Sequence, residues 1–283
     1  MIDGGKIEGW GVWDGVMEVQ QAWGSRWDEC RNSIQRRWMK TTAEKESLVI
    51  LAADRPTMAG LVDLIETVGD KIAALKTHVD LVDDWTAEGW FKLCELAKSA
   101  DLMIMEDRKF ADIGKICRDQ MAGSYDIRSW ANLVTAHMIS GPDIVEGLLA
   151  GWDAVGRDGG VLLLAQMSSR GNLIDALYSE QVVAKGRESD GCFGFIGNGS
   201  RPDELRRLRA AVGTQKMIWT PGVNLDIGDG EMGQRYGDPH EAVLAGSDGV
   251  IVGSGIHRAE NIQLAASEYA TTSWEALLKR TRD

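Results

Sequence analysis

Eight short apolar runs recur along this chain, and they restrict the folds that it can adopt more than any other feature of the sequence. Between them lie stretches in which apolar residues return every three or four positions, as at Leu61, Leu64, Ile65 and Val68. Buried strands that alternate with amphipathic helices produce this pattern. The runs cover residues 48–53, 72–75, 102–105, 133–136, 161–165, 193–196, 217–219 and 250–252. Eight strand–helix units predict an α/β fold, a closed parallel (β/α)8 barrel of the TIM type.

An open, doubly wound sheet is the structural alternative. A dinucleotide-binding sheet of that kind carries G-x-G-x-x-G at its first strand–helix turn. This chain has Ala53-Asp54-Arg55-Pro56 there, and its later glycines 194, 197 and 199 have a different spacing. The closed barrel is therefore the preferred prediction.

One barrel of roughly 250 residues accounts for most of this chain, which has 283 residues. We predict a barrel domain over residues 41–283 and an N-terminal extension over residues 1–40. Tryptophans three or four positions apart share a helical face, which favours packing under the barrel or at a subunit contact over a ligand site. The extension carries five of the 11 tryptophans, Trp10, Trp13, Trp23, Trp27 and Trp38.

The composition restricts the kinds of partner that this protein can bind. A net charge of -12 and a pI near 4.9 argue against nucleic acid or an anionic membrane and leave room for a local basic pocket that takes a small phosphorylated molecule. The four cysteines are scattered and no histidine shows a metal-ligand spacing, so no metal site is predicted. Reduced thiols, together with the lack of a membrane-length apolar run or a signal-like start, predict a cytoplasmic protein.

Charged residues gather directly after the second and third apolar runs. Asp107-Arg108-Lys109 follows the third run, and Lys76 follows the second. Residues two apart on a strand share a face, so Asp107 and Lys109 should point the same way and Arg108 the other way. An isolated Asp-Arg-Lys sequence is as often a solvated loop, but barrel enzymes carry their chemistry where the strands end. The pattern indicates an active site with alternating Lys and Asp charges.

Two of these segments, from Asp107 to Gly114 and from Lys76 to Asp80, closely resemble the signatures of the orotidine 5'-phosphate decarboxylase family, especially its eukaryotic-type branch. The resemblance extends from about residue 48 to the C-terminus. In the family's order it includes Leu164-Ala165-Gln166-Met167-Ser168, Thr220-Pro221-Gly222-Val223, Gly233-Gln234-Arg235-Tyr236 and Ile251-Val252-Gly253.

The resemblance implies decarboxylation of orotidine 5'-phosphate to uridine 5'-phosphate in pyrimidine biosynthesis, with no metal or organic cofactor. The carbanion formed at C6 of the pyrimidine has no adjacent carbonyl to accept its charge, so it needs direct electrostatic stabilisation. Lys109 would stabilise and protonate that carbanion, and Asp107 would lie beside the departing carboxylate. Lys76 and Asp112 would complete the array. The family's aspartate at the position of Asp112 reaches into the neighbouring subunit, which implies a homodimer with shared sites.

The resemblance also implies a set of substrate-binding residues. On the residues alone, Asp54 before Arg55-Pro56 would fit a helix cap, and Ser168 beside Ser169 would fit an ordinary loop. Residues 220–236 resemble a mobile loop that closes over the phosphate and excludes water. The set comprises Asp54 for the ribose, Ser168 for the pyrimidine amide edge, Gln234 and Tyr236 for the phosphate, and Pro221, Gly253 and Ser254 in the matched segments.

Two positions depart from the family pattern. The family has Val-Gly-Arg after the eighth strand, with the arginine on the phosphate, where this chain has Ser254. Ile116 stands where a threonine usually contacts the ribose of the partner's substrate. A lost charge-assisted hydrogen bond costs about 1.5 to 3 kcal/mol, or roughly tenfold to more than a hundredfold in binding. Backbone amides near Ser254, Arg235 and Arg258 are the candidate replacements.

These departures leave alternative functions open. One is decarboxylation of a related carboxylated nucleoside or nucleotide with altered ribose-phosphate recognition. Another is pyrimidine-nucleotide binding without catalysis, although a full set of paired lysines and aspartates is costly to hold in a pocket that only binds. A scaffold role for the tryptophan-bearing extension is a third.

Overall fold

The strands form a closed barrel of eight parallel strands, which confirms the predicted fold class. The computed structural model describes residues 15–226, 228–229 and 234–282. The strand order around the barrel is β1-β10-β7-β6-β5-β4-β3-β2, and every predicted apolar run contributes one strand. These strands are β1 (Val49–Ala52), β2 (Ala74–Thr77), β3 (Met103–Phe110), β4 (Leu133–Ala136), β5 (Gly160–Leu164), β6 (Cys192–Ile196), β7 (Met217–Thr220) and β10 (Gly249–Val252).

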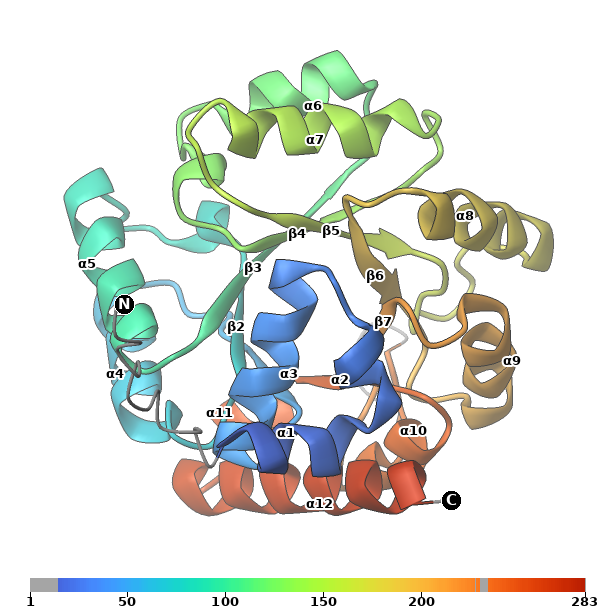
Figure 1. Cartoon of the computed structure of the whole chain (residues 1–283). Coiled ribbons are helices and arrows are strands. Elements are labelled where there is room, and N and C mark those ends of the chain that lie inside the picture. Colours follow the sequence, from blue (N-terminus) through green and yellow to red (C-terminus); the bar gives the residue numbers. More distant parts are fainter. Residues whose placement is uncertain (1–14, 227, 230–233, 283) are drawn as a thin grey trace, which may run out of the picture.

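Helices surround the barrel (Figure 1). The helix α4 (Met58–Val68) buries Leu61, Leu64, Ile65 and Val68, the apolar stripe read from its sequence. The outer ring continues with α5 (Ala87–Ser99), α6 (Gly114–Met121), α7 (Asp143–Asp153), α8 (Ala176–Glu188), α9 (Pro202–Val212), α10 (Pro239–Leu244) and α12 (Ile262–Arg282). Short elements are the 3-10 turns η1 (Val79–Leu81) and η2 (Ile127–Ser129), the helix α11 (Ser254–His257), and the hairpin of β8 (Gly228–Asp229) and β9 (Arg235–Tyr236). None of the helices in the described ranges has the length and apolar character to cross a bilayer.

Three N-terminal helices, α1 (Gly15–Trp23), α2 (Ser25–Glu29) and α3 (Ser33–Lys45), lie across the end of the barrel where the strands begin (Figure 1). Trp38 of α3 is fully buried there. Its Nε1 donates to the carbonyl of Asp248 at 3.0 Å, and its ring lies 4.5 Å from that of Trp219 on β7. Trp38 therefore packs against the interior at this end of the barrel, in agreement with the packing role predicted for the tryptophans.

The structure describes only some of the other tryptophans of the extension. Trp23 is buried and donates to Thr42 Oγ1 at 3.1 Å. Trp10 and Trp13 lie outside the described residues. The domain boundary at residue 40 stays a prediction, and α3 runs across that position.

A buried ion cluster joins the N-terminal helices to the barrel. Asp248, at the start of β10, is fully buried and pairs with three arginines: Arg26 of α2 at 2.6 Å, Arg280 of α12 at 2.8 Å, and Arg209 of α9. We call this the arginine cluster. Burial acts to raise the pKa of Asp248, but the three guanidinium groups outweigh it and hold that pKa well below its usual range.

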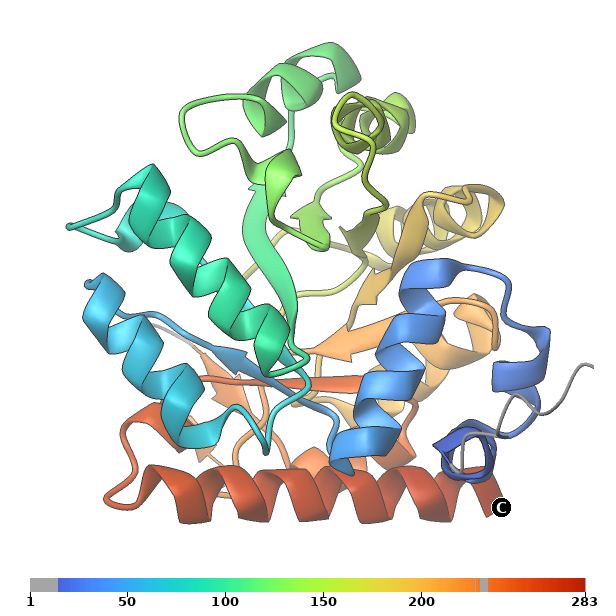
Figure 2. The same cartoon turned by 60° about the vertical axis from the view of Figure 1, so that its left-hand side comes forward.

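The first and last described helices meet beside this cluster. Figure 2 shows α1 next to the C-terminal end of α12, where Thr281 Oγ1 donates to the carbonyl of Ala22 at 2.8 Å. The first and last strands, β1 and β10, also pair directly. The barrel is thus closed by the pairing of its first and last strands.

Candidate active site

Four charged side chains meet at the opposite face, where the strands end. β2 lies between β1 and β3, so Lys76 at the end of β2 reaches residues from both neighbours. Its Nζ lies 3.3 Å from Asp54 Oδ1, in the loop after β1. The same Nζ is 3.7 Å from Asp107 Oδ2 on β3, and Lys109 Nζ is 2.8 Å from that oxygen. We call Asp54, Lys76, Asp107 and Lys109 the charge array.

An irregularity in β3 aims Lys109 at Asp107. The register of β3 against β4 shifts between Glu106 and Phe110, and Lys109 has a φ of 48°, a left-handed conformation that is uncommon outside glycine. Thr135 of β4 supports this bulge: its Oγ1 accepts from the Lys109 backbone N–H at 2.9 Å and donates to Asp107 Oδ1 at 2.7 Å. The two side chains therefore point the same way, as the strand periodicity indicated.

Thr135 itself was missed by the sequence reasoning. It belongs to a run that reads only as a buried strand, and the contact depends on the pairing of β3 with β4. The signal that would have found it is a hydroxyl near the carboxyl end of the strand next to β3.

Arg108 points to the other side, where its Nη1 lies 2.7 Å from Asp80. The preceding Glu106 is fully buried and accepts from Thr77 Oγ1 at 2.7 Å and from the backbone N–H of Val79 at 3.1 Å. Burial raises the pKa of Glu106 to about 7, despite these hydrogen bonds. Through these hydrogen bonds Glu106 fixes the position of the turn after β2.

The electrostatics of the array favour its ionised form. Burial acts to raise the pKa of Asp107, but Lys76 and Lys109 outweigh it and lower that pKa to about 2. His78 Nε2 lies 3.6 Å from the same carboxylate. Burial, followed by repulsion from Lys76, lowers the pKa of His78, so this imidazole is neutral at pH 7. Asp107 is the shared anion of two ammonium groups.

The array borders a cavity of about 650 Å³. The turn that follows β10 also lines the cavity, with Ser254 and Arg258. Of the residues predicted to bind substrate, the cavity is lined by Asp54, Ser168, Pro221, Gln234, Tyr236, Gly253 and Ser254.

Hydrogen bonds join several of these residues across the cavity mouth. Gln234 Nε2 donates to Ser168 Oγ at 3.0 Å, which connects the loop after β5 to the loop after β7. The hydroxyls of Tyr236 and Ser254 lie 3.5 Å apart. Residues 227 and 230–233, including Gly233 of the matched segment, lie outside the described residues.

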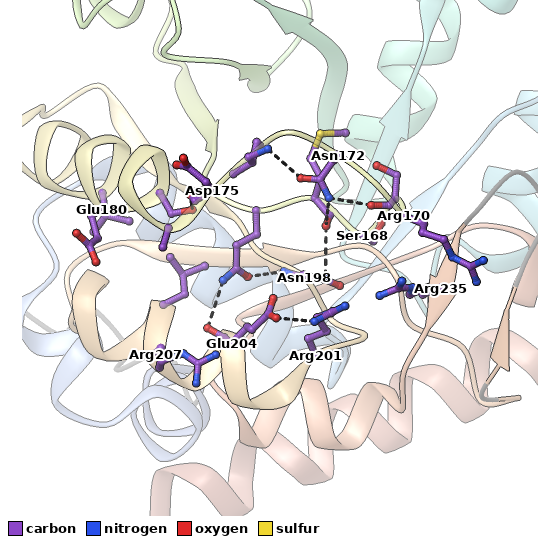
Figure 3. Close-up of a pocket in the computed structure, with 18 of the residues that line it drawn as sticks. Ser168, Arg170, Asn172, Asp175, Glu180, Asn198, Arg201, Glu204, Arg207 and Arg235 are labelled. Carbon is purple, nitrogen blue, oxygen red and sulfur yellow. Dashed lines mark hydrogen bonds and ion pairs between the residues drawn. The ribbon is translucent and has the colours of Figure 1, made fainter.

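A second cavity of about 580 Å³ adjoins the first. The two share a wall that includes Ser168 and Ser169. Figure 3 shows Arg170, Arg201 and Arg235 on one side of it, with Arg201 paired to Glu204. Gln234 and Tyr236 line the first cavity, while Arg235 between them lines the second, as alternation along an extended segment requires.

Asp112 does not join the array of its own chain. Its side chain is exposed, and its Oδ1 accepts from the backbone N–H of Ile113 at 2.7 Å. Neither Asp112 nor Ile116 lines the 650 Å³ cavity. Ile113, next to it in the chain, is 55% exposed, and Ser140, whose Oγ donates to the Asp112 carbonyl at 2.7 Å, follows Ile139, which is 70% exposed.

Potential metal ligands do not cluster within residues 15–226, 228–229 and 234–282: no group of three or more His, Cys, Asp or Glu side chains could hold an ion there.

The fold is that of a barrel enzyme, and paired lysine and aspartate side chains lie at the carboxyl ends of its strands, where enzymes of this fold carry their chemistry. A sequence model described as "Orotidine 5'-phosphate decarboxylase / HUMPS family" matches residues 47–269, and the chain belongs to this family.

Relatives with established names agree with this assignment. The chain is 36% identical to the orotidine 5'-phosphate decarboxylase of Mucor circinelloides f. lusitanicus over 94% of its own length and 98% of that protein. It is 35% identical to the enzyme of that name from Schizosaccharomyces pombe, over 93% of this chain and 97% of the relative. The crystal structure of orotidine 5'-monophosphate decarboxylase from Sulfolobus solfataricus superposes with a TM-score of 0.62 at 27% identity and covers 82% of this chain and 99% of that one.

Proposed function

We propose that this protein decarboxylates orotidine 5'-phosphate to uridine 5'-phosphate and carbon dioxide, a step of pyrimidine biosynthesis. The observation that carries the proposal is the pairing of Lys109 with Asp107 at 2.8 Å, beside a cavity large enough for a nucleotide. The relatives named above bear the same activity in their names. The small-molecule partner is thus a pyrimidine nucleotide.

In the proposed reaction the charge array stabilises a carbanion. The bond between C6 of the pyrimidine and its carboxylate breaks, carbon dioxide leaves, and the electron pair stays on C6. The ammonium group of Lys109 stabilises this pair and then transfers a proton to C6, and solvent returns a proton to the amine. Asp107 and Lys76 fix that ammonium in place before the reaction begins, which is how preorganised charge lowers a barrier. The step needs no cofactor, because side chains supply both the cation and the proton.

Carbon dioxide release from orotidine 5'-phosphate by the purified protein tests the proposal, with the product identified by mass spectrometry. Lys109→Ala should abolish turnover in a folded protein, because it removes both the cation and the acid. Lys115→Ala on α6, which removes an exposed lysine paired with Asp119, is the matched control. Turnover that survives in a folded Lys109→Ala protein would contradict the mechanism, and a folded wild-type protein without turnover would contradict the function.

We further propose a homodimer in which Asp112 completes the partner's site. In support, Asp112 is exposed and does not line the cavity of its own chain, and the large apolar side chains Ile113 and Ile139 are exposed as well. Burial of such side chains is the usual driving force of a symmetric contact.

Subunit mixing tests the shared site. Asp112→Ala and Lys109→Ala should each be inactive alone. Random exchange of the two should restore about a quarter of the wild-type sites, because each mixed two-fold dimer has one intact site. No recovery after verified exchange would contradict the sharing of Asp112.

We place the protein in the cytoplasm in the same proposal. Its four cysteines are all free thiols, which is the usual state in a reducing compartment. Fractionation of the producing cells against cytosolic marker enzymes tests this placement.

A further inference from the structure

A cavity of about 640 Å³ lies on the outside of the barrel, between α5 and the segment that leads into β4. Met105 and Asp107 of β3 line the cavity beside the charge array, whereas Ile104 on the opposite face of the strand lines this one. The two cavities share no lining residue. We call the new one the outer cavity. Its volume is within the range of small-molecule sites.

Aromatic rings line the outer cavity. Trp85 meets Tyr125 edge-on with the ring centroids 5.1 Å apart, and Trp90 packs against Trp130 at 5.0 Å. Phe91, the next residue on α5, is 66% exposed. The indole N–H groups of Trp85 and Trp90 have no acceptor among the described residues, so ring contacts hold this wall together. Such a wall suits the flat apolar surface of another ring.

Two guanidinium groups in the outer cavity have no carboxylate partner within the described part of the chain. Arg157 is half-buried and donates to backbone carbonyls, with the Arg128 carbonyl nearest at 2.8 Å. Arg37 is also half-buried and donates to the Leu102 carbonyl at 3.3 Å. Burial lowers the pKa of Arg157, and repulsion from Arg37 acts in the same direction. Two like charges therefore share one cavity without a protein anion between them.

The acidic side chains that line the outer cavity do not relieve this repulsion, because each contacts another side chain. These contacts are Glu95 with Lys98 at 3.8 Å, Asp126 with Arg128 at 2.9 Å, and Asp101 with Thr41 at 3.1 Å. A carboxylate brought by a ligand would supply the missing anion, since a guanidinium binds it through two parallel hydrogen bonds.

We propose that the outer cavity binds an aromatic carboxylate, with its ring packed against the aromatic wall and its carboxylate held by Arg37 and Arg157. A neutral ring would leave both guanidinium groups unpaired, and a small anion would leave the aromatic wall uncovered. The proposal is independent of the proposed function, because the outer cavity has no residue in common with the cavity beside the charge array.

Calorimetry with 2-naphthoate tests the proposal. We expect one molecule to bind per chain with a Kd below about 1 mM. The Kd should be the same in the presence and absence of saturating uridine 5'-phosphate, which is the probe for the other cavity. Two comparison ligands separate the ring from the charge: 2-naphthalenemethanol keeps the ring system without the charge, and acetate keeps the charge without the ring. Each should bind at least about tenfold more weakly than 2-naphthoate.

Three variants locate the binding. Arg37→Gln should weaken 2-naphthoate binding about ten- to a hundredfold and leave 2-naphthalenemethanol binding unchanged, because it removes a charge-assisted contact. Phe91→Ala should weaken both ligands about two- to tenfold, because it removes an exposed ring from the wall. Arg206→Gln, an exposed change on α9 that breaks a pair with Asp203, is the matched control and should alter neither affinity. Circular dichroism verifies that each variant is folded.

Several results would overturn the proposal. They are a failure of 2-naphthoate to saturate the wild-type protein, its displacement by uridine 5'-phosphate, equally tight binding of 2-naphthalenemethanol, and unchanged 2-naphthoate binding in folded Arg37→Gln and Phe91→Ala. Carbon dioxide release from orotidine 5'-phosphate bears only on the proposed function, so either proposal can fail while the other stands.

Discussion

At both ends of the barrel a carboxylate sits among basic side chains, but the two clusters are built differently. The arginine cluster surrounds Asp248 with Arg26, Arg209 and Arg280, and the carboxylate is fully buried. The charge array surrounds Asp107 with two lysines, beside an open cavity of about 650 Å³. Arginine remains protonated and fixes a planar geometry, whereas lysine is a point charge that can give up a proton. We therefore expect the arginine cluster to contribute mainly to stability, and we propose that the charge array carries the chemistry.

The largest expected effect lies at the buried end. Asp248→Asn should lower the free energy of unfolding by about 3 to 5 kcal/mol, because it leaves three guanidinium groups without their shared anion. Chemical denaturation measures this loss. Turnover per folded molecule should remain near the wild-type value, and a selective loss of turnover at unchanged stability would break the comparison.

At the charge array we expect a large loss of turnover and a smaller loss of stability. Asp107→Asn should lower kcat by about a hundred- to a thousandfold, since Lys109 loses the anion that positions it. Its unfolding free energy should change by less than that of Asp248→Asn, because Lys76 keeps Asp54 at 3.3 Å. Asp119→Asn, an exposed substitution on α6, is the control for both kcat and the free energy of unfolding. A stability loss as large as at Asp248 would show that the array is mainly structural.

Glu106, next to Asp107 in the chain, should make the free energy of unfolding depend on pH. Its pKa is raised by burial from 4.5 to about 7 in the folded protein, so between these values the folded state binds more protons than the unfolded chain. The free energy of unfolding should therefore fall as the pH rises through this window, by up to about 3 kcal/mol. Denaturation series from pH 4.5 to 7 measure the slope. Glu106→Gln should flatten it, while Glu95→Gln at the exposed surface of α5 should leave it unchanged.

The smallest expected effect concerns the support of the array. Thr135→Val keeps the volume of the side chain but removes its bonds to Asp107 and to the Lys109 backbone. A loss of one such contact is worth about 1 kcal/mol, so kcat should fall by roughly two- to tenfold. Thr281→Val, which removes a hydroxyl contact to Ala22 at the other end, should leave kcat unchanged. An unaffected Thr135→Val enzyme would show that the bulge in β3 positions Lys109 unaided.

The sequence predicted the barrel and the shared direction of Asp107 and Lys109 because both depend on short-range periodicity. It did not predict the left-handed backbone at Lys109, which arises from the register shift against β4. The arginine cluster was also out of reach, since Arg26 and Asp248 are 222 residues apart and neither belongs to a motif. The roles of the site residues remain predictions, because distances show which groups meet and not what they do to a substrate.

The pairing of β1 with β10 also sets the order in which this protein can mature. A chain still on the ribosome presents the edge of β1 without its neighbour, and an unpaired strand edge is a site for misassociation. Arg26 is synthesised 222 residues before Asp248, and Arg280 follows later still. Such long-range contacts slow folding, since the loop between them must close first. We therefore expect a newly made chain to close its barrel only after both β10 and α12 have been synthesised.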